Sequence, residues 1–568
     1  MIKKLIKILS VIFCVIVLII LYVSFIGIKT EKFNKIIINK VLEINKKIKL
    51  DLKDVKFLLD PYNLTVNITT KDPIILLDSN KLQVKNLTTN ISLKSLVLDK
   101  FSIDDLKIST KPIKLNDVIL LVRSFKNSTE LFLLDRVIKE GFLTADIKLK
   151  FDSEGRVRED YQINGFIKNG KLNFLNKFNA NNLNLNFDIS KNKYFLKDIN
   201  VKINDVNTSS PLIEINEEKG LFLIKGKILT AEKDFSKDQL SSIFTSLLIN
   251  ANIEKTRFSS ENKIYFNFNK KLKFNNLNIE SKINLNQLVV KNDFINLKPY
   301  LPNLDKIINF ENHKIIINYD KNKTDIKGNG EISIKDKFDS INYKVIKNND
   351  KFTFDIKANL KNNKLSINFI EYEKKENSDA SILIIGNIKN DNLINFDLIS
   401  LIEKNNTILL KNLNLNKDFK IIDIDSFNFN YLNKNKIKNK LLLKRNNSNY
   451  NIEGESFDAT KLINDIMVSD DENSSLFSNL NSEVNLKINK IYIDKINFIN
   501  NFYGTLNYKN NKINNLDIKS IFPNNKIISL LIKTNDQQEK ITKLFTDYPK
   551  PLIKRYDFIK GFEEGYLD

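Results

Sequence analysis

Apolar residues recur at every second position through most of this chain of 568 residues, and this period constrains the fold more than any other feature. One stretch shows it clearly, with Leu183, Leu185, Phe187 and Ile189 separated by Asn184, Asn186 and Asp188. Successive side chains of a β-strand point to opposite faces, so the stretch predicts a strand with one apolar and one polar face. The alternation recurs in the ranges 64–68, 147–151, 199–203, 272–279, 422–429, 484–488 and 506–508.

Short segments rich in asparagine separate the predicted strands. They include the ranges 191–193, 361–364 and 509–512. Asparagine tolerates the left-handed backbone conformation that tight hairpins need, and the chain has only 14 glycines to serve the same purpose. The segment Gly328-Asn329-Gly330 is likewise interpreted as a hairpin turn before a strand at 331–334.

The strand pattern predicts a mainly β fold. Strands with turns at intervals of about 8 to 12 residues usually form sandwiches or barrels. The chain has no exact repeat and no closing motif that would mark several independent sandwiches, so a single continuously extended antiparallel sheet is the sharper alternative. Short helices are expected over 113–125, 236–250, 301–310, 458–468 and 537–545.

One segment near the N-terminus predicts a membrane-spanning helix. Residues 8–28 carry no charge and supply roughly the 20 apolar residues that a helix needs to cross a bilayer. Lysines at positions 3, 4 and 7 place the tail 1–7 in the cytoplasm and the body beyond the membrane. A cleaved signal peptide is the alternative, but the run exceeds the usual h-region of about 7 to 15 residues and lacks a clear small-x-small cleavage site. An uncleaved signal anchor is favoured.

The chain just after this segment changes its period. Apolar residues recur at helical spacing at Phe33, Ile37, Val41 and Ile44. This pattern predicts an amphipathic juxtamembrane helix over 29–50. The only cysteine, Cys14, lies within the apolar segment, so the body has no internal disulfide and depends on burial and strand pairing.

The formal net charge is +22, and lysine supplies nearly all of the excess. The lysines are spread along the chain without forming blocks or a basic stripe interleaved with aromatic residues. A nucleic-acid partner is therefore not expected. A general affinity for acidic lipid headgroups stays open.

The sequence offers little material for catalysis, metal binding or cofactors. Its one histidine, His313, precedes a predicted strand at 315–319 and is interpreted as a solvated turn residue. The glycines form no dinucleotide or P-loop pattern, and acidic pairs such as Asp104-Asp105 are typical of solvated positions. We expect no enzyme activity, no catalytic residue, no metal site and no cofactor.

The layout of the N-terminal part resembles that of the AsmA-like envelope proteins, the family of AsmA, TamB and YhdP. The resemblance rests on residues 90–125, where Ile91-Ser92-Leu93-Lys94-Ser95-Leu96, the segment 101–108 and Lys111-Pro112-Ile113 look like the family's strand, turn and returning strand. Residues 454–463 and 547–565 are similar to later phrases of the YhdP-like branch, except that Phe562 and Glu563 replace glycines. By this resemblance, 51–235 is an N-terminal AsmA-like β region, 236–455 a middle β-groove region, and 456–568 the start of a C-terminal region that stops early.

The resemblance implies an open β-groove that carries phospholipids from a bacterial inner membrane toward the outer membrane. It implies a single-pass protein with a periplasmic body, whose bridge is completed by an outer-membrane or periplasmic partner. The groove-lining candidates are Leu183, Leu185, Phe187, Ile189, Phe427 and Phe429. The alternatives are an anchored β-scaffold that assists outer-membrane protein assembly and a surface adhesin of stacked sandwiches.

Overall fold

The protein folds as two compact units, which are described separately. The computed structural model describes residues 2–31, 34–35, 38–39, 42, 48–77, 80–93, 103–125, 129–152, 157–174, 178–237, 239–240, 252–269, 273–291, 305–333, 337–349, 351–389, 393–463, 481–509, 512–535 and 539–556. Unit 1 comprises Met1–Ala231 and Ser260–Glu280, and unit 2 comprises Glu232–Ser259 and Ser281–Asp568.

Unit 1 begins with the apolar helix α1 (Ile2–Phe25), which is long and apolar enough to cross a membrane. Gly27 follows it at a φ of 77°, and its N–H donates to the carbonyl of Tyr22 over 3.0 Å. A residue in the left-handed region is a common helix terminator, and here it turns the chain directly into strand β1 (Ile28–Thr30). The predicted anchor segment is therefore helical as far as Phe25.

The juxtamembrane helix predicted over 29–50 is wrong at both ends. Strand β1 occupies its first residues, and strand β2 (Ile48–Asp51) occupies its last. Between them, residues 34, 35, 38, 39 and 42 are helical, and the other positions of 32–47 lie outside the described residues. Both ends lie outside the helical spacing at residues 33–44, and each end is held in a strand by its partner, β1 by β3 and β2 by β5.

The rest of unit 1 is a sheet with a helical hairpin. Its further strands are β3 (Val55–Asp60), β4 (Thr65–Lys71), β5 (Ile74–Leu77), β6 (Asn80–Ser92), β7 (Ile103–Thr110), β8 (Ile113–Lys114), β9 (Ile138–Lys150), β10 (Gln162–Phe174), β11 (Phe178–Ser190), β12 (Lys193–Ile203) and β13 (Val206–Glu218). Helices α4 (Leu115–Phe125) and α5 (Thr129–Val137) lie between β8 and β9 in the chain. Strands β14 (Leu221–Phe235), β15 (Asn252–Asn269) and β16 (Phe274–Lys291) have residues in both units.

Unit 2 is also a sheet with short additions. Its strands are β17 (Ile307–Asp320), β18 (Lys323–Ser333), β19 (Phe338–Asn348), β20 (Lys351–Leu360), β21 (Leu365–Ile367), β22 (Tyr372–Lys374), β23 (Ala380–Ile388), β24 (Ile394–Glu403), β25 (Asn406–Leu415), β26 (Ile421–Leu432), β27 (Lys438–Asn446), β28 (Asn449–Asp458), β29 (Ser482–Tyr492), β30 (Phe498–Lys509), β31 (Lys512–Ile521), β32 (Ile527–Thr534) and β33 (Lys540–Thr546). A 3₁₀ turn, η2 (Asn368–Ile370), joins β21 to β22, and helix α8 (Lys550–Tyr556) follows β33.

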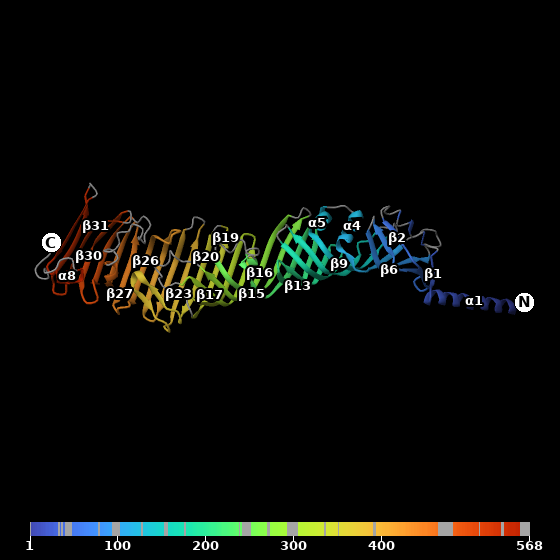
Figure 1. Cartoon of the computed structure of the whole chain (residues 1–568), viewed down its shortest axis with the longest axis horizontal. Helices are drawn as coiled ribbons and strands as arrows, with labels where there is room; N and C mark the ends of the chain where they lie inside the picture. The colour runs from blue at the N-terminus through green and yellow to red at the C-terminus, as the bar shows by residue number, and fades with distance from the viewer. Residues whose placement is uncertain are drawn as a thin grey trace. The chain divides into compact units, whose positions relative to one another are not determined.

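Within each unit, strands that follow one another in the chain mostly lie side by side and run antiparallel (Figure 1). In unit 1, β7 pairs with β9 across the inserted helices α4 and α5. In unit 2, β20 pairs with β23 across the segment β21–η2–β22, and β28 pairs with β29 in parallel. The predicted fold class is confirmed, because the protein is mainly β with an open curled sheet, few short helices and an N-terminal apolar helix.

All the ranges predicted to be strands contain strands, whereas only some of the predicted helices are confirmed. The prediction over 113–125 is confirmed over 115–125 by α4, whereas Ile113 and Lys114 form β8, and residues 460–463 within 458–468 are helical. The range 236–250 falls mostly outside the described residues, as do 301–304 and 464–468. The helix predictions at 301–310 and 537–545 are wrong over 307–310 and 540–545, because β17 and β33 occupy those positions. Pairing of β33 with β32 overrides the helix-forming composition of 537–545.

Asparagine shapes the sheet in two ways. It occupies the hairpin turn between β11 and β12, where Asn192 has a φ of 58°, as the sequence predicts. It also sits inside strands at the left-handed positions Asn182, Asn312 and Asn501, each at a shift of the pairing register. A bulge of this kind bends its strand and increases the local twist, which gives the sheet its curl.

Two predictions around His313 are wrong. The residue lies inside β17 with 1% of its surface exposed, instead of in a solvated turn. Gly328 and Gly330 lie inside β18, instead of in a hairpin turn. A Cβ on Gly330 would lie 2.4 Å from His313 Cγ, and one on Gly328 would lie 2.3 Å from Tyr343 Cζ. The two glycines thus leave room for two rings that pack on the neighbouring strands.

The imidazole of His313 has a partner at each nitrogen. Its Nε2 lies 2.9 Å from the carbonyl oxygen of Glu331, which only accepts, so Nε2 carries the proton. Its Nδ1 lies 3.2 Å from the hydroxyl of Tyr343, which then donates to it. Burial lowers the pKa of His313 below its usual 6.5, more than the hydrogen bond and charge of Glu331 raise it. Burial also raises the pKa of Tyr343 to about 12.

The lowered pKa of His313 predicts a pH-dependent stability. Below about pH 6.5 the unfolded chain binds a proton at this residue that the folded chain does not, so the stabilisation is complete above that pH and is lost as the pH falls. We expect the free energy of unfolding to decrease between pH 7.5 and 5.5, measured by urea titrations of the full chain. His313→Gln should flatten this decrease, since the chain has 1 histidine. An equal decrease in both proteins would contradict the prediction.

Candidate functional site

Unit 1 presents a continuous apolar surface, because the strand register keeps apolar residues opposite one another. Ile163 of β10 lies opposite Ile147 of β9 and Ile189 of β11. Phe187 of β11 lies opposite Leu196 of β12. This surface is named the apolar face of unit 1, and it comprises Leu143, Ala145, Ile147, Ile163, Ile167, Leu183, Leu185, Phe187, Ile189, Leu196, Ile199, Val201 and Ile213.

The apolar face of unit 1 is only partly buried. Leu185 and Phe187 are 8% and 5% exposed, whereas Leu183 and Ile189 stay half-buried at its margins. All four residues predicted from the sequence therefore lie on one face, as two packed and two more accessible side chains. Contiguous apolar surface that stays partly accessible on a folded protein is a candidate place for another molecule to bind.

Glycines bring the strands and helix α4 close to this face. A Cβ on Gly165 would lie 2.6 Å from Phe187 Cζ, so the Phe187 ring packs directly over the backbone of β10. A Cβ on Gly141 would lie 2.7 Å from Leu115 Cδ1, where α4 begins. The helical hairpin therefore rests on the sheet at β9 and leaves the more distant apolar positions of β11 accessible.

Unit 2 repeats the arrangement. Phe427 of β26 lies between Leu410 of β25 and Leu443 of β27, and Phe429 is the next residue on the same face. The two phenylalanine rings stack with 4.4 Å between their centroids. The apolar face of unit 2 includes Leu401, Ile408, Leu410, Leu413, Phe427, Phe429, Leu441, Leu443, Ile452, Val484, Leu486, Ile488 and Leu506.

Short elements cover one end of the apolar face of unit 2. The segment β21–η2–β22 packs Ile370 and Tyr372 there, and the hydroxyl of Tyr431 donates to the carbonyl of Ile370 over 2.7 Å. Helix α8 adds Leu552 to the same cluster. At the opposite ends of these strands, Leu413 and Val484 belong to a second cluster. Phe429 is 5% exposed on the covered side, whereas Phe427 contacts both clusters and is half-buried.

A buried polar cluster holds the covering segment in place. Lys374 is 0% exposed, and its Nζ donates to the carbonyls of Lys361, Asn363 and Lys375 over 3.0, 2.7 and 3.1 Å. The carboxylate of Asp339 accepts the backbone N–H groups of residues 361, 362 and 363 over 2.8 to 2.9 Å. The ammonium of Lys374 therefore holds carbonyl groups of the loop at 361–363, and the carboxylate of Asp339 holds the N–H groups of the same loop.

Glu403 completes this cluster. Its carboxylate accepts hydrogen bonds from the hydroxyls of Tyr372 and Ser378, both over 2.6 Å, and from Asn406 over 3.2 Å. Burial raises the pKa of Glu403. These hydrogen bonds and the nearby Lys374 together lower it by more than burial raises it, so the pKa of Glu403 lies below its usual value. Burial lowers the pKa of Lys374 against the opposing effect of nearby carboxylates. Because each of these charged groups has hydrogen-bond partners within unit 2, we interpret the cluster as structural.

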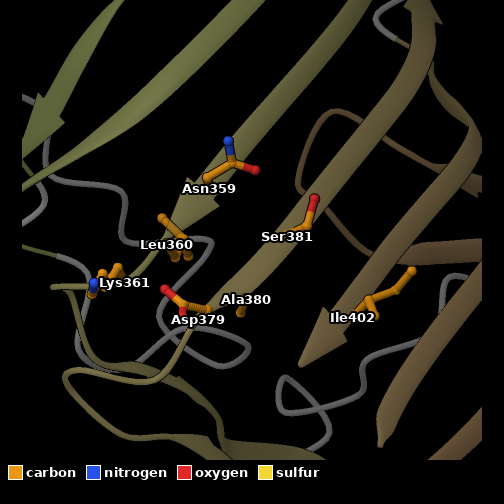
Figure 2. Close-up of a pocket in the computed structure, with 7 residues that line it drawn as sticks. All are labelled: Asn359, Leu360, Lys361, Asp379, Ala380, Ser381 and Ile402. Carbon is orange, nitrogen blue, oxygen red and sulfur yellow. The ribbon is translucent and has the colours of Figure 1, made fainter. Parts of the chain in front are cut away.

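A pocket of about 350 Å³ lies beside the fastened segment, lined by Asn359, Leu360, Lys361, Asp379, Ala380, Ser381 and Ile402. Figure 2 shows Lys361 and Asp379 where the chain leaves and rejoins the sheet, below the paired strands that carry Asn359 and Ser381. The pocket thus marks the base of the covering segment.

No family model, no curated protein and no solved structure matches this chain. Its functional surfaces are therefore judged from their own geometry.

Sequence reasoning found the apolar faces and missed the polar cluster. All six candidate lining residues lie on the apolar faces, where Leu185, Phe187 and Phe429 are packed and Leu183, Ile189 and Phe427 are more accessible. Asp339, Lys374 and Glu403 come from separate strands, and nothing in their local sequence distinguishes them from solvated charges. A lysine at the end of a three-residue strand gives no signal of burial.

The difference between packed and accessible positions predicts different costs of truncation. Phe187→Ala should destabilise unit 1 by about 3 kcal/mol, since it leaves a cavity over Gly165. Leu183→Ala should cost about 1 kcal/mol, because less of its surface is removed from water in the folded state. Hydrogen exchange of the amides of β10 to β12 in the full chain measures both values. Equal costs would show that the two positions do not differ in packing.

The fastening of the covering segment predicts a second difference. Lys374→Met should destabilise the segment by about 3 kcal/mol, because it leaves buried carbonyl groups and carboxylates without their cation. The neighbouring Lys375→Met is the matched control, since Lys375 is exposed. Limited proteolysis should cleave 361–379 faster in the first variant only. Unchanged cleavage of the Lys374 variant would show that Lys374 does not hold the covering segment in place.

Proposed function

We propose that this protein holds phospholipid acyl chains along the apolar faces of its sheet and conducts them away from the membrane in which α1 is anchored. One observation carries the proposal: the apolar surface continues from strand to strand and stays partly exposed. Water is an unfavourable neighbour for such a surface, and acyl chains would replace it. Headgroups would remain at the open side of the curled sheet.

The energetics suit transport as well as storage. Each methylene that leaves water contributes about 0.8 kcal/mol, so an acyl chain of ordinary length is retained firmly. Neighbouring strands present equivalent apolar positions, such as Leu410, Phe427 and Leu443. A chain that slides from one strand to the next exchanges one apolar contact for another and crosses only a small barrier. This function requires no catalytic group.

Helix α1 and the sequence resemblance support a proposed placement of the protein. The helix is long and apolar enough to cross a bilayer, and lysines precede its apolar core. We propose a single-pass protein of a bacterial inner membrane with a periplasmic body, of the AsmA-like kind and nearest to its YhdP-like branch. A partner at the outer membrane or in the periplasm would receive the lipid.

Site-specific photo-crosslinking in bacterial cells tests the proposal. A photoreactive phenylalanine analogue replaces Phe427, which lies on the apolar face, or its exposed neighbour Asn428, whose side chain points to the other face. Ile147 and Lys148 form the equivalent pair in unit 1. We expect phospholipid adducts, identified by mass spectrometry, at Phe427 and Ile147 and at least tenfold fewer at their neighbours.

The controls separate groove binding from general contact with the membrane. Equal adduct yields on both faces would indicate bulk bilayer contact, and an absence of adducts at both apolar positions would reject the proposal. Adducts to protein at the apolar positions would favour the scaffold alternative instead.

A further inference from the structure

The polar face of unit 2 carries a regular array of amines and amides across four neighbouring strands. In one row, Lys314 of β17, Asn329 of β18, Asn342 of β19 and Lys357 of β20 lie opposite one another in turn. In the next row, Ile316, Lys327, Lys344 and Asp355 do the same. The array, which includes the exposed side chain of Ile316, lies on the face opposite to the side chain of Tyr343.

The array surrounds a shallow, open depression of about 560 Å³, lined by its eight residues together with Gly328 and Tyr343. Its shape follows from side-chain length, because the short Asn329 and Asn342 stand at the centre of one row with lysines around them. Opposite residues on neighbouring strands have Cβ atoms about 5 Å apart, so Lys327 and Lys344 can reach the same small group. Lys314 and Lys357 flank it diagonally.

The charge of the array is not neutralised by the protein. Within the described residues, none of the four lysines forms an ion pair, and Asp355 is the one carboxylate of the array. Elsewhere, exposed lysines do meet carboxylates, as in Lys263 with Glu280, and Lys107, which lies opposite Lys148 of β9, pairs with Asp105. Like charges directly opposite each other on neighbouring strands destabilise a sheet. The Lys327–Lys344 pair is therefore unfavourable. Asp355, which lies opposite Lys344 on its other side, offsets part of this repulsion, and a bound anion would offset more of it.

We infer that this array, named the lysine hollow, is a binding site for a ligand that carries two or more phosphate groups. Lysine ammonium groups bind phosphate as point charges, and the amides of Asn329 and Asn342 donate further hydrogen bonds. One phosphate lies between Lys327 and Lys344, and the next reaches Lys314 or Lys357. The ligand is either a free polyphosphate or a bisphosphorylated lipid headgroup, which share this chemistry.

The lysine hollow is independent of the apolar faces. Along β19, Tyr343 points to the apolar side and Lys344 to the polar side, because successive residues alternate. Failure of lipid crosslinking at Phe427 would leave this inference intact, and failure of phosphate binding would leave the proposed lipid function intact.

Calorimetric titration of the full chain in neutral detergent tests the inference. One arm uses inorganic tripolyphosphate, and the other uses the water-soluble deacylated headgroup of cardiolipin. The double variant K327Q/K344Q should weaken binding at least tenfold. The matched control is K411Q/K444Q, which removes two exposed lysines from the polar face of β25 and β27. The control should change binding less than twofold.

Each outcome decides the question. Tighter binding of tripolyphosphate supports the inference with a free ligand, and tighter binding of the headgroup supports it with a lipid-borne one. No binding in either arm, or equal weakening by both double variants, would overturn it. Thermal unfolding supplies a second measurement, since the ligand should raise the midpoint of the wild type and leave that of K327Q/K344Q unchanged.

Discussion

The registered pairing of antiparallel strands that alternate in polarity is the constraint on which the rest of the structure depends. A shift of one residue between any two strands would turn the apolar side chains of one strand to the polar side. The pairs Ile163 with Ile189 and Phe427 with Leu443 show that this register is kept across each sheet. Where the register does shift, as around Asn182 and Asn312, a left-handed asparagine absorbs the extra residue and the faces are preserved.

The fold was largely predictable because its signal is local and repeated. The alternation from Leu183 to Ile189 predicts which side chains share a face, and in strand β11 these side chains do lie on one face. The segment 537–545 shows the limit of such reasoning. Its residues favour a helix when considered alone, yet the open edge of β32 offers seven pairs of partners to the strand β33, and pairing prevails.

The polar interior was not predictable, because it depends on residues that meet only in the folded chain. His313 is buried since Gly330 on the next strand lacks a side chain, and Lys374 is buried since the carbonyls of a distant loop surround its ammonium group. Neither environment leaves a periodic trace in the sequence. The sequence also could not separate packed from accessible lining residues. The inserted segment β21–η2–β22 decides that Phe429 is packed and Phe427 is more accessible.

The two faces of the sheet are free to serve different chemistry, because a strand commits only alternate residues to each. In unit 2, the apolar side must keep its bulk and register, since Phe427 and its neighbours pack against one another. The polar side needs only to stay solvated, and its composition can vary without disturbing the sheet. Elsewhere on the polar side, side chains form ion pairs and amide contacts with one another, such as Asn395 with Asn414 over 2.7 Å. Where strand pairing places Lys327 opposite Lys344, the sheet gains nothing by itself, and the proposed anion would offset the repulsion between the two ammonium groups.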